Sequence, residues 1–320
     1  MMKLRALVVL AALISVPLVA KAQEWPNRTV HFIVPFPAGG STDVAARMVA
    51  EHLSRQLRQQ VVVENKTGAN GNIGMEFVAK AAPDGYTVLI GTDSVSSNPH
   101  VYKMTFDPLK ELVPLVEFSR QPIALAAHPS LGVNTLAELT ALAKQQPGLR
   151  FGTGSGVGSL QAMVTLWYAK LAGLSLEQVP YRGGGQAIND LIAGHIKLGS
   201  LGTTPLVPHY KTGALKLLAQ SMSTRSPALP NVPTYQEAGM PGLVVDQRLG
   251  AFLPVGVPPN IATRLNAGIN MALADDKIRK AFADQAQDAA GGTAESYAKL
   301  VLEDSNKYAR LVKDLNIKAE

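Results

Sequence analysis

Fourteen residues decide the fold of this chain: Val30-His31-Phe32-Ile33-Val34-Pro35-Phe36-Pro37-Ala38-Gly39-Gly40-Ser41-Thr42-Asp43. A short apolar run, typical of a buried strand, ends at two prolines, and the glycine pair then permits a turn with positive φ. Ser41, Thr42 and Asp43 supply the hydroxyls and the first-turn acid that commonly start a helix. Such a corner gathers backbone N–H groups at the positive end of a helix dipole, which favours a bound carboxylate or phosphate. On these residues alone, a plain structural turn remains the alternative.

The first 22 residues have the pattern of a secretory signal peptide. Lys3 and Arg5 precede an uncharged apolar run from Ala6 to Ala20, and Ala20-Lys21-Ala22 fits the small-x-small cleavage rule. The run is shorter than the roughly 20 residues that a membrane-spanning helix needs. We therefore predict cleavage after Ala22 and, in a bacterium, a periplasmic location. An uncleaved membrane anchor is the alternative.

Charge and residue content argue against several classes of protein. Removing Lys3, Arg5 and Lys21 lowers the formal net charge from +6 to +3, and no basic run of five residues occurs, so nothing favours nucleic-acid binding. The lack of cysteine excludes disulfides, thiol catalysis and cysteine-bound metals. The six histidines are scattered without the spacing of metal ligands. We expect no nucleic-acid partner, no metal and no cofactor.

Strand and helix patterns alternate along the chain, which predicts an α/β protein. An amphipathic helix is expected from Ser41 to Leu57, and the strand crossovers predict parallel sheets. Residues 99–117 look irregular, and the alternation restarts at a strand from Ile123 to Ala127. We therefore expect two α/β lobes, with residues 23–123 and 247–320 in the first and residues 124–246 in the second.

A second glycine loop, Gly154-Ser155-Gly156-Val157-Gly158-Ser159, follows a predicted strand and precedes a predicted helix, as the first loop does. Two helix N-termini that face each other across a cleft would hold one anionic group better than either alone. The carboxyl ends of parallel strands are also where ligands commonly bind. The glycine spacing does not match a dinucleotide-binding loop. Two unrelated tight turns are the alternative.

Arg248 lies in an otherwise strand-like stretch, where its guanidinium needs water or an anionic partner. It could clamp a ligand carboxylate through two parallel hydrogen bonds, or it could pair with Asp246 on the same face. Both roles remain open. Asp43 and Asp93 follow strands, and we expect them to cap helices or to hold loops.

The common catalytic motifs are absent. The sequence contains no P-loop, no H-E-x-x-H and no G-x-S-x-G. Hydroxyls at Ser41, Ser155 and Ser159 lie near glycines, so an exported hydrolase acting on a small acid is the alternative from another class. It would lack an identifiable base, and we expect the protein not to be an enzyme.

Several motifs together resemble the tripartite tricarboxylate transporter substrate-binding proteins, also called Bug receptors. The resemblance covers the chain from Trp25 onward and rests on Ile33 to Asp43, Val63 to Lys66 with Gly68 to Gly74, Ala82 to Tyr86, Val179 to Gly183, and Ser226 to Thr234. It implies a type II periplasmic binding protein fold, in which two α/β lobes close like a hinge on a ligand between them. It also implies delivery of a carboxylate to membrane transporter subunits, and we expect a monomer. A carboxylate sensor for a signalling partner is an alternative within the family.

The resemblance implies that the two glycine loops hold a carboxylate. The expected ligand-binding residues are Phe36, Pro37, Ala38, Gly39, Gly40, Thr42, Asp43, Thr92, Gly154, Ser155, Gly158, Ser159, Thr203, Thr204 and Arg248.

Two departures from the family pattern bear on the ligand. The family commonly has an Asp-Asn pair where this chain has Gly199 to Thr204, which argues against a ligand with an ammonium group. Arg248 stands where an aromatic residue is usual, and there it could meet a second carboxylate. We therefore expect a dicarboxylate without an amino group, and terephthalate is a candidate because some family members bind aromatic dicarboxylates.

Overall fold

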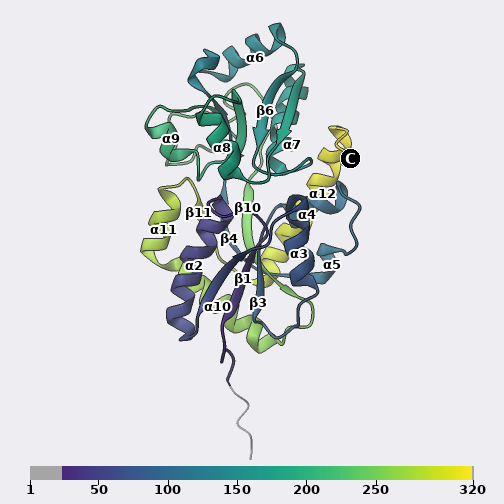
Figure 1. Cartoon of the computed structure of the whole chain (residues 1–320), viewed down its shortest axis with the longest axis vertical. Coiled ribbons are helices and arrows are strands. Elements are labelled where there is room, and N and C mark those ends of the chain that lie inside the picture. Colours follow the sequence, from purple (N-terminus) through teal and green to yellow (C-terminus); the bar gives the residue numbers. More distant parts are fainter. Residues whose placement is uncertain (1–23, 319–320) are drawn as a thin grey trace, which may run out of the picture.

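The computed structural model describes residues 24–318 and consists of two α/β lobes, one above the other in Figure 1. The signal peptide and its cleavage site, predicted above, lie outside the described residues. The strands are β1 Val30–Val34, β2 Val61–Asn65, β3 Thr87–Thr92, β4 Leu112–Gln121, β5 Ile123–Ala127, β6 Leu149–Thr153, β7 Leu176–Pro180, β8 Leu198–Gly202, β9 Lys216–Gln220, β10 Gln247–Pro254 and β11 Asp288–Ala289. The helices are α2 Ser41–Leu57, α3 Asn72–Ala79, α4 Ser94–Ser97, α5 Pro108–Glu111, α6 Leu136–Gln145, α7 Leu160–Ala172, α8 Gly184–Ile192, α9 Val207–Lys211, α10 Pro259–Ala274, α11 Asp276–Ala283 and α12 Ala294–Asp314, with short 3₁₀ turns η1 Ala69–Gly71, η2 Asn98–His100 and η3 Pro129–Leu131.

The first lobe is built on a six-stranded sheet in the order β11-β4-β10-β3-β1-β2. β1 runs parallel to β2 and β3, whereas β10 runs antiparallel to β3 and β4. Both faces of the sheet are buried: Phe32 of β1 packs into the core formed with α2 and α10, while the neighbouring Ile33 packs into a second core with α3 and α12. A strand covered on both sides is largely apolar, which fits β1, where only the partly buried His31 is not apolar.

The second lobe has a five-stranded sheet in the order β7-β6-β8-β5-β9. β6, β7 and β8 are parallel, and β5 is antiparallel to both of its neighbours. Alternate residues of β5 enter two cores, with Leu125 packed towards α6 and α7 and Ala126 towards α8 and α9. The helices therefore cover both faces of this sheet as well.

Two expectations about the strands need correction. The region at 99–117, expected to be irregular, contains α5 and the start of the ten-residue strand β4. Pro114 cannot donate to a strand partner, and the pairing of β4 with β10 shifts register between Ala251 and Phe252, where Phe252 faces Pro114. The sheets are mixed, not parallel, because β5 and β10 enter them directly from the other lobe without a helical crossover.

The chain passes between the lobes at two adjacent places, from β4 into β5 and from Val245 into β10. The Ser221 hydroxyl binds both: it accepts from the Ile123 N–H at 2.9 Å and donates to the Val245 carbonyl at 2.6 Å. α12 adds a contact between the lobes, because Tyr297 belongs to a core of the first lobe and Tyr308 to a core of the second. The last turns of α12 therefore pack on the second lobe, although the sequence assigned residues 247–320 to the first.

Gly250 of β10 lies under the ring of Tyr297, which is 2% exposed. A Cβ on Gly250 would lie 2.3 Å from Tyr297 Oη and 2.4 Å from its Cζ. We expect Gly250→Ala to lower the free energy of unfolding by about 1–3 kcal/mol through overpacking, measured by urea denaturation. Gly185→Ala is the control, because a Cβ there meets no atom within 4 Å. Equal stability of both variants would contradict the packing of α12 on β10.

Candidate functional site

The first glycine loop is held by side chains that follow it. Asn65 Nδ2 donates to the Phe36 carbonyl and to Asp43 Oδ1, both at 2.9 Å, and the Gly39 N–H donates to Asp43 Oδ2 at 3.0 Å. Arg47 donates to both oxygens of Asp43, at 3.0 and 2.8 Å. Burial alone would raise the pKa of Asp43, but these hydrogen bonds and the charge of Arg47 lower it. The carboxylate of Asp43 therefore fixes the loop and is not free for a ligand.

The loop delivers the N-terminus of α2 to the space between the lobes. Gly40 is the N-cap and supplies no side-chain cap, and the first N–H groups of a helix have no partner within it. Ser41 and Thr42, in the first turn, both line a cavity there. The positive end of the helix dipole thus faces this cavity.

The second glycine loop brings the N-terminus of α7 to the same cavity from the other lobe. The Gly154 N–H donates to Gln161 Oε1 at 2.7 Å, and the Ser200 hydroxyl donates to the Gln161 carbonyl at 2.7 Å. Ser159 is the N-cap residue of α7. Gln161 thereby ties the loop to its own helix, and Ser155 and Ser159 line the cavity.

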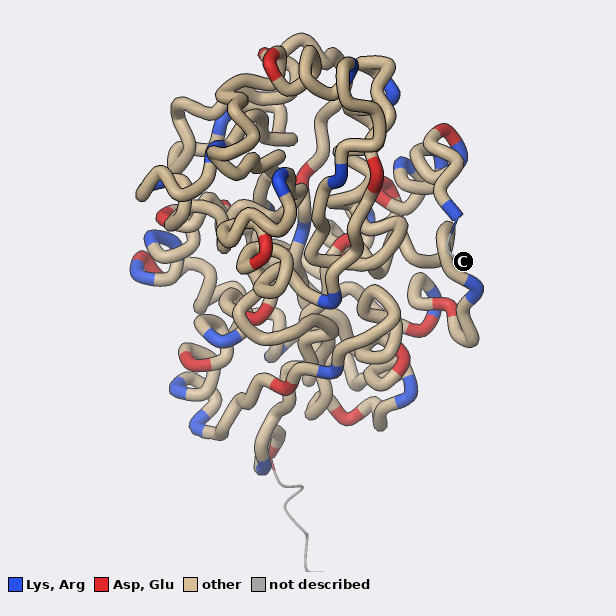
Figure 2. Tube along the Cα trace, turned by 45° about the horizontal axis from the view of Figure 1, so that its top comes forward, with Lys and Arg blue, Asp and Glu red and all other residues tan. Residues whose placement is uncertain are grey.

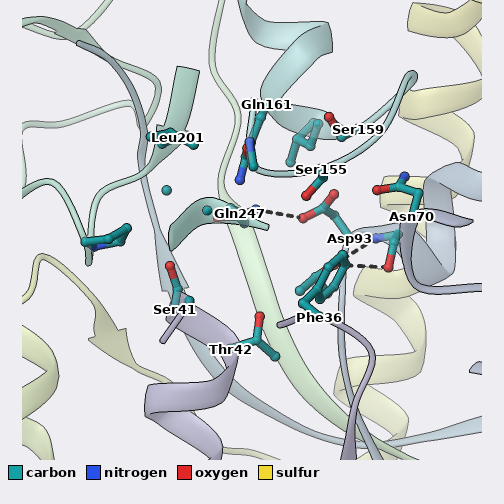
Figure 3. A pocket seen from close by; sticks show the side chains of 18 of the residues that line it. Phe36, Ser41, Thr42, Asn70, Asp93, Ser155, Ser159, Gln161, Leu201 and Gln247 are labelled. Atoms are coloured by element: carbon teal, nitrogen blue, oxygen red, sulfur yellow. Dashed lines mark hydrogen bonds between the residues drawn. The ribbon is translucent and has the colours of Figure 1, made fainter. Parts of the chain in front are cut away.

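The two helix starts share one cavity, drawn in Figure 3. About 50 Å³ of it is open to the centre of a water molecule, whereas one enclosed water needs about 10–15 Å³ on this measure. A space of this size therefore suits a small molecule. Its walls are formed by Phe36, Pro37, Gly40, Ser41, Thr42, Asn70, Thr92, Asp93, Ser94, Gly154, Ser155, Ser159, Leu160, Gln161, Gly184, Leu201, Gly202, Pro205 and Gln247.

The structure brings together about half of the residues expected from the sequence. Those that line the cavity are Phe36, Pro37, Gly40, Thr42, Thr92, Gly154, Ser155 and Ser159. Those placed elsewhere are Ala38, Gly39, Asp43, Gly158, Thr203, Thr204 and Arg248. Several neutral lining residues were not expected from the sequence, notably Asn70, Gln161 and Gln247. The position of Gln161 directly after the second glycine loop was the one signal in the sequence that could have identified it as a lining residue. The side-chain amides of Asn70 and Gln247 belong to no recognisable motif.

Thr203 and Thr204 lie behind the cavity, at the junction of the lobes. The Thr204 hydroxyl donates to Gln121 Oε1 at 2.9 Å, and Gln121 Nε2 donates to Gln247 Oε1 at 2.8 Å. Gln247 Nε2 then donates to Asp93 Oδ1 at 3.3 Å. The threonines therefore lie between the lining residues Gly202 and Pro205, and Gln121 links Thr204 to Gln247 of the cavity wall.

Arg248 is bound by acids of the protein itself and is not among the described residues that line the cavity. Its Nη1 donates to Glu117 at 2.7 Å, its Nε to Asp304 at 3.1 Å and its Nη2 to Asp246 at 3.4 Å. Burial would lower the pKa of the guanidinium, but the charges of these acids raise it. The alternative pairing with Asp246 is found, together with two acids far away in the sequence.

The lobes are closed on each other around the cavity. A Cβ on Gly183 would lie 2.7 Å from Pro37 Cγ, and one on Gly158 would lie 2.5 Å from Val101 Cγ1. The Tyr102 hydroxyl, from the first lobe, donates to the Val157 carbonyl of the second. Glycine at positions 158 and 183 is therefore needed for the loops to approach this closely.

A second, outer cavity adjoins the first and shares Phe36, Asn70 and Ser155 with it. Tyr181 and the exposed Arg182 lie on its wall. Elsewhere Lys and Arg are interspersed with Asp and Glu over both lobes (Figure 2). Arg182 is thus an exposed cation on the wall of the second cavity.

Residues 24–318 contain neither a membrane-spanning helix nor a metal-binding cluster. No helix in this range combines the length and the apolarity needed to cross a bilayer. No group of three or more His, Cys, Asp or Glu side chains in it is placed to hold a metal ion.

The chain is similar to known receptors over most of its length. A sequence model described as "tripartite tricarboxylate transporter family receptor" matches residues 45–317. Protein BugT of Bordetella pertussis is 33% identical over 300 residues, which cover 93% of this chain and 92% of BugT.

Solved structures of such receptors match both lobes. R. palustris Rpa4515 with adipate has a TM-score of 0.89 and 31% identity, covering 92% of this chain and 100% of that one. Periplasmic binding protein BugD has a TM-score of 0.88 and 30% identity, again covering 92% of this chain and 100% of that one. MatC from Rhodopseudomonas palustris with bound malate has a TM-score of 0.85 and 29% identity, covering 90% of this chain and 100% of that one. The expected two-lobed α/β fold of periplasmic binding proteins is confirmed.

Arg248→Ala tests the role of the guanidinium in the fold. We expect the free energy of unfolding to fall by about 3–5 kcal/mol, because Glu117, 4% exposed, would keep a buried charge without its main partner. Urea denaturation measures the change. Arg55→Ala, which removes an exposed pair with Glu51, is the matched control and should cost less than about 1 kcal/mol. A loss in R248A as small as that of the control would contradict this assignment.

Proposed function

Because the chain belongs to the tripartite tricarboxylate transporter family of receptors, we propose that it captures a small dicarboxylate between its lobes and delivers it to the membrane subunits of such a transporter. The observation that supports this most directly is the shared cavity: the N-termini of α2 and α7, from different lobes, open on the same small space. Family members are periplasmic substrate-binding receptors, and we propose the same location for this chain, acting as a monomer.

The proposed binding mode uses neutral donors. One ligand carboxylate accepts hydrogen bonds from the first-turn N–H groups of α2 and from hydroxyls such as those of Thr42 and Ser155. Hydrogen bonds to an ionised acceptor are stronger than those between neutral groups, and the low polarity of a closed cleft strengthens them further. No lysine or arginine is among the described residues that line the cavity, so release does not require breaking an ion pair.

Cavity size and the relatives bear on the ligand class. The small enclosed space favours short aliphatic acids. The relatives solved with adipate and malate contain dicarboxylates, which fits this class. Terephthalate, the larger candidate, would extend into the outer cavity, where Arg182 can meet its second carboxylate. Arg182 thereby replaces Arg248 as the proposed distal partner of a long ligand.

Capture depends on closure. Donors from both lobes surround the cavity only when the lobes are closed, so a ligand that contacts both shifts the protein towards the closed form. A transporter can then distinguish loaded from empty receptors by shape. A sensor role for the same closed form is the alternative that shares this site.

The hydrolase alternative has little support at this site. Ser41, Ser155 and Ser159 line the cavity, but no histidine or lysine is among its described lining residues. Asp93 is the one group there that could act as a base, and its single side-chain hydrogen bond is to Gln247.

A thermal-shift screen of mono-, di- and tricarboxylates tests the proposed function. We expect malate or adipate to stabilise the protein by about 2.7 kcal/mol when present at 100 times its Kd, and acetate to have a much smaller effect. Arg182→Ala should weaken stabilisation by terephthalate and leave that by malate unchanged. A screen in which no carboxylate raises Tm would refute the proposal.

Gly183→Ala tests closure separately from folding. The added methyl group would collide with Pro37 across the cleft, and overpacking of about 1–3 kcal/mol corresponds to roughly 5- to 150-fold weaker binding. The free energy of unfolding should change little, because the collision is between the lobes. Gly185→Ala, two residues away in open space, should bind as the wild type does. Calorimetry with malate and adipate measures both, and unchanged affinity in G183A would argue against closure as described.

A further inference from the structure

Asp93 is the feature of the cavity that the proposed binding mode leaves unused. It follows β3 directly, it is 7% exposed, and it is the one titratable side chain among the described lining residues. In Figure 3 its carboxyl group points towards the loop that contains Ser155. A dicarboxylate in this space would bring negative charge close to an acid.

The carboxyl group of Asp93 lies between the lobes. Gln247, at the junction of the lobes, donates from its Nε2 to Asp93 Oδ1 at a distance of 3.3 Å. The backbone of Leu160, the first residue of α7 in the second lobe, also acts on this carboxyl group and lowers its pKa. Asp93 thus lies at the helix start where a ligand carboxylate was expected, so the two carboxyl groups must be neighbours.

No free cation compensates this charge among the described neighbours of Asp93. Arg248 of β10 is bound to three acids, and Lys307 of α12 donates to the Val244 carbonyl at 2.7 Å. Burial is the largest cause that raises the pKa of Asp93, and the charge of Asp304 adds to it. The hydrogen bond from Gln247 lowers the pKa, and the result is a value of about 7. The titratable or charged groups on the elements packed around it are Glu117, Asp246, Arg248, Tyr297, Asp304, Lys307 and Tyr308, with His100 bonded to Ser305 beyond them.

We propose that Asp93 binds the ligand as a neutral acid and donates its O–H to a ligand carboxylate, so that capture of a dicarboxylate dianion takes up one proton. This inference rests on the proposed function and specifies it, since an ionised Asp93 could only accept a hydrogen bond and would repel the dianion. The proton comes from solvent, is held by Asp93 in the bond to the ligand oxygen, and returns to solvent on release. No covalent bond other than the O–H of Asp93 forms or breaks.

The sign of the pH dependence follows from this assignment. A ligand that binds only protonated Asp93 raises the pKa of that carboxyl group above its value of about 7 in the empty protein. Below that pH Asp93 is already neutral, and affinity is constant as long as the ligand itself remains a dianion. Above it, affinity falls towards tenfold per pH unit, and each binding event takes up close to one proton.

Calorimetry of the wild-type protein with adipate and with malate, in two buffers of different protonation enthalpy, measures this proton uptake directly. We expect little uptake at a pH below 7 where both ligand carboxylates are still ionised, and uptake approaching one proton well above pH 7. Adipate is the stricter probe because it has no hydroxyl group to donate to an ionised Asp93.

Asp93→Asn tests the donor. Its Oδ1 can still accept from Gln247 while its Nδ2–H₂ replaces the acid O–H, so we expect binding within about threefold of the wild type below pH 7 and no proton uptake at any pH. Asp93→Ala removes the donor and should bind more than about tenfold more weakly. Asp284→Asn, an exposed acid paired with Lys280, is the matched control and should keep the wild-type pH profile.

The outcomes separate this inference from the proposed function. If neither probe binds at any pH and no other carboxylate raises Tm, the proposed function fails and this inference fails with it. If dicarboxylates bind without proton uptake, or more tightly as the pH rises, Asp93 is an ionised acceptor and only this inference is overturned. The wild-type measurement decides this even if a variant does not fold.

Discussion

The side-chain hydrogen bond between Gln121 and Gln247 links the joint of the two lobes to the cavity. Gln121 ends β4 and Gln247 begins β10, so the bond lies where the first chain crossing starts and the second one ends. Gln247 continues to Asp93 in the cavity wall, and Gln121 accepts from Thr204 of the second lobe. A Cβ on Gly202 would lie 2.6 Å from both amides, so β8 ends directly against the pair. A change in the cavity wall therefore reaches the hinge through direct bonds.

Most charged side chains near the ligand-binding cavity do not line it. The strong ion pairs lie outside it: Arg47 with Asp43 behind the first loop, and Arg248 with its three acids behind β10. These pairs fix the backbone that surrounds the cavity. The cavity itself presents N–H groups, hydroxyls, amides and one buried acid. Partial charges of this kind hold an anion firmly enough to capture it, without the long residence that a buried ion pair would impose.

Local sequence predicted what local physics determines. α2 begins and ends at the predicted residues Ser41 and Leu57, because its buried row and its start signal lie within the segment itself. The two glycine loops that line the cavity could likewise be recognised, because their glycines and helix-start signals lie within the segments themselves. β4 was missed because Pro114 hides a strand whose partner, β10, lies more than a hundred residues away. The partners of Arg248 were missed likewise, since Glu117 and Asp304 are separated from it by 131 and 56 positions.

α12 affects how far the lobes can separate. The helix has 21 residues, about 31 Å at 1.5 Å per residue, and its two ends are anchored in different cores by Tyr297 and Tyr308. Rotating one lobe away from the other must bend α12 or move Tyr308 out of its buried position in the second core. Small rotations strain it little and large ones strain it increasingly, so the helix acts as an elastic stop. The length of α12 thereby limits how wide the cleft can gape, and with it the rate at which a bound molecule can escape.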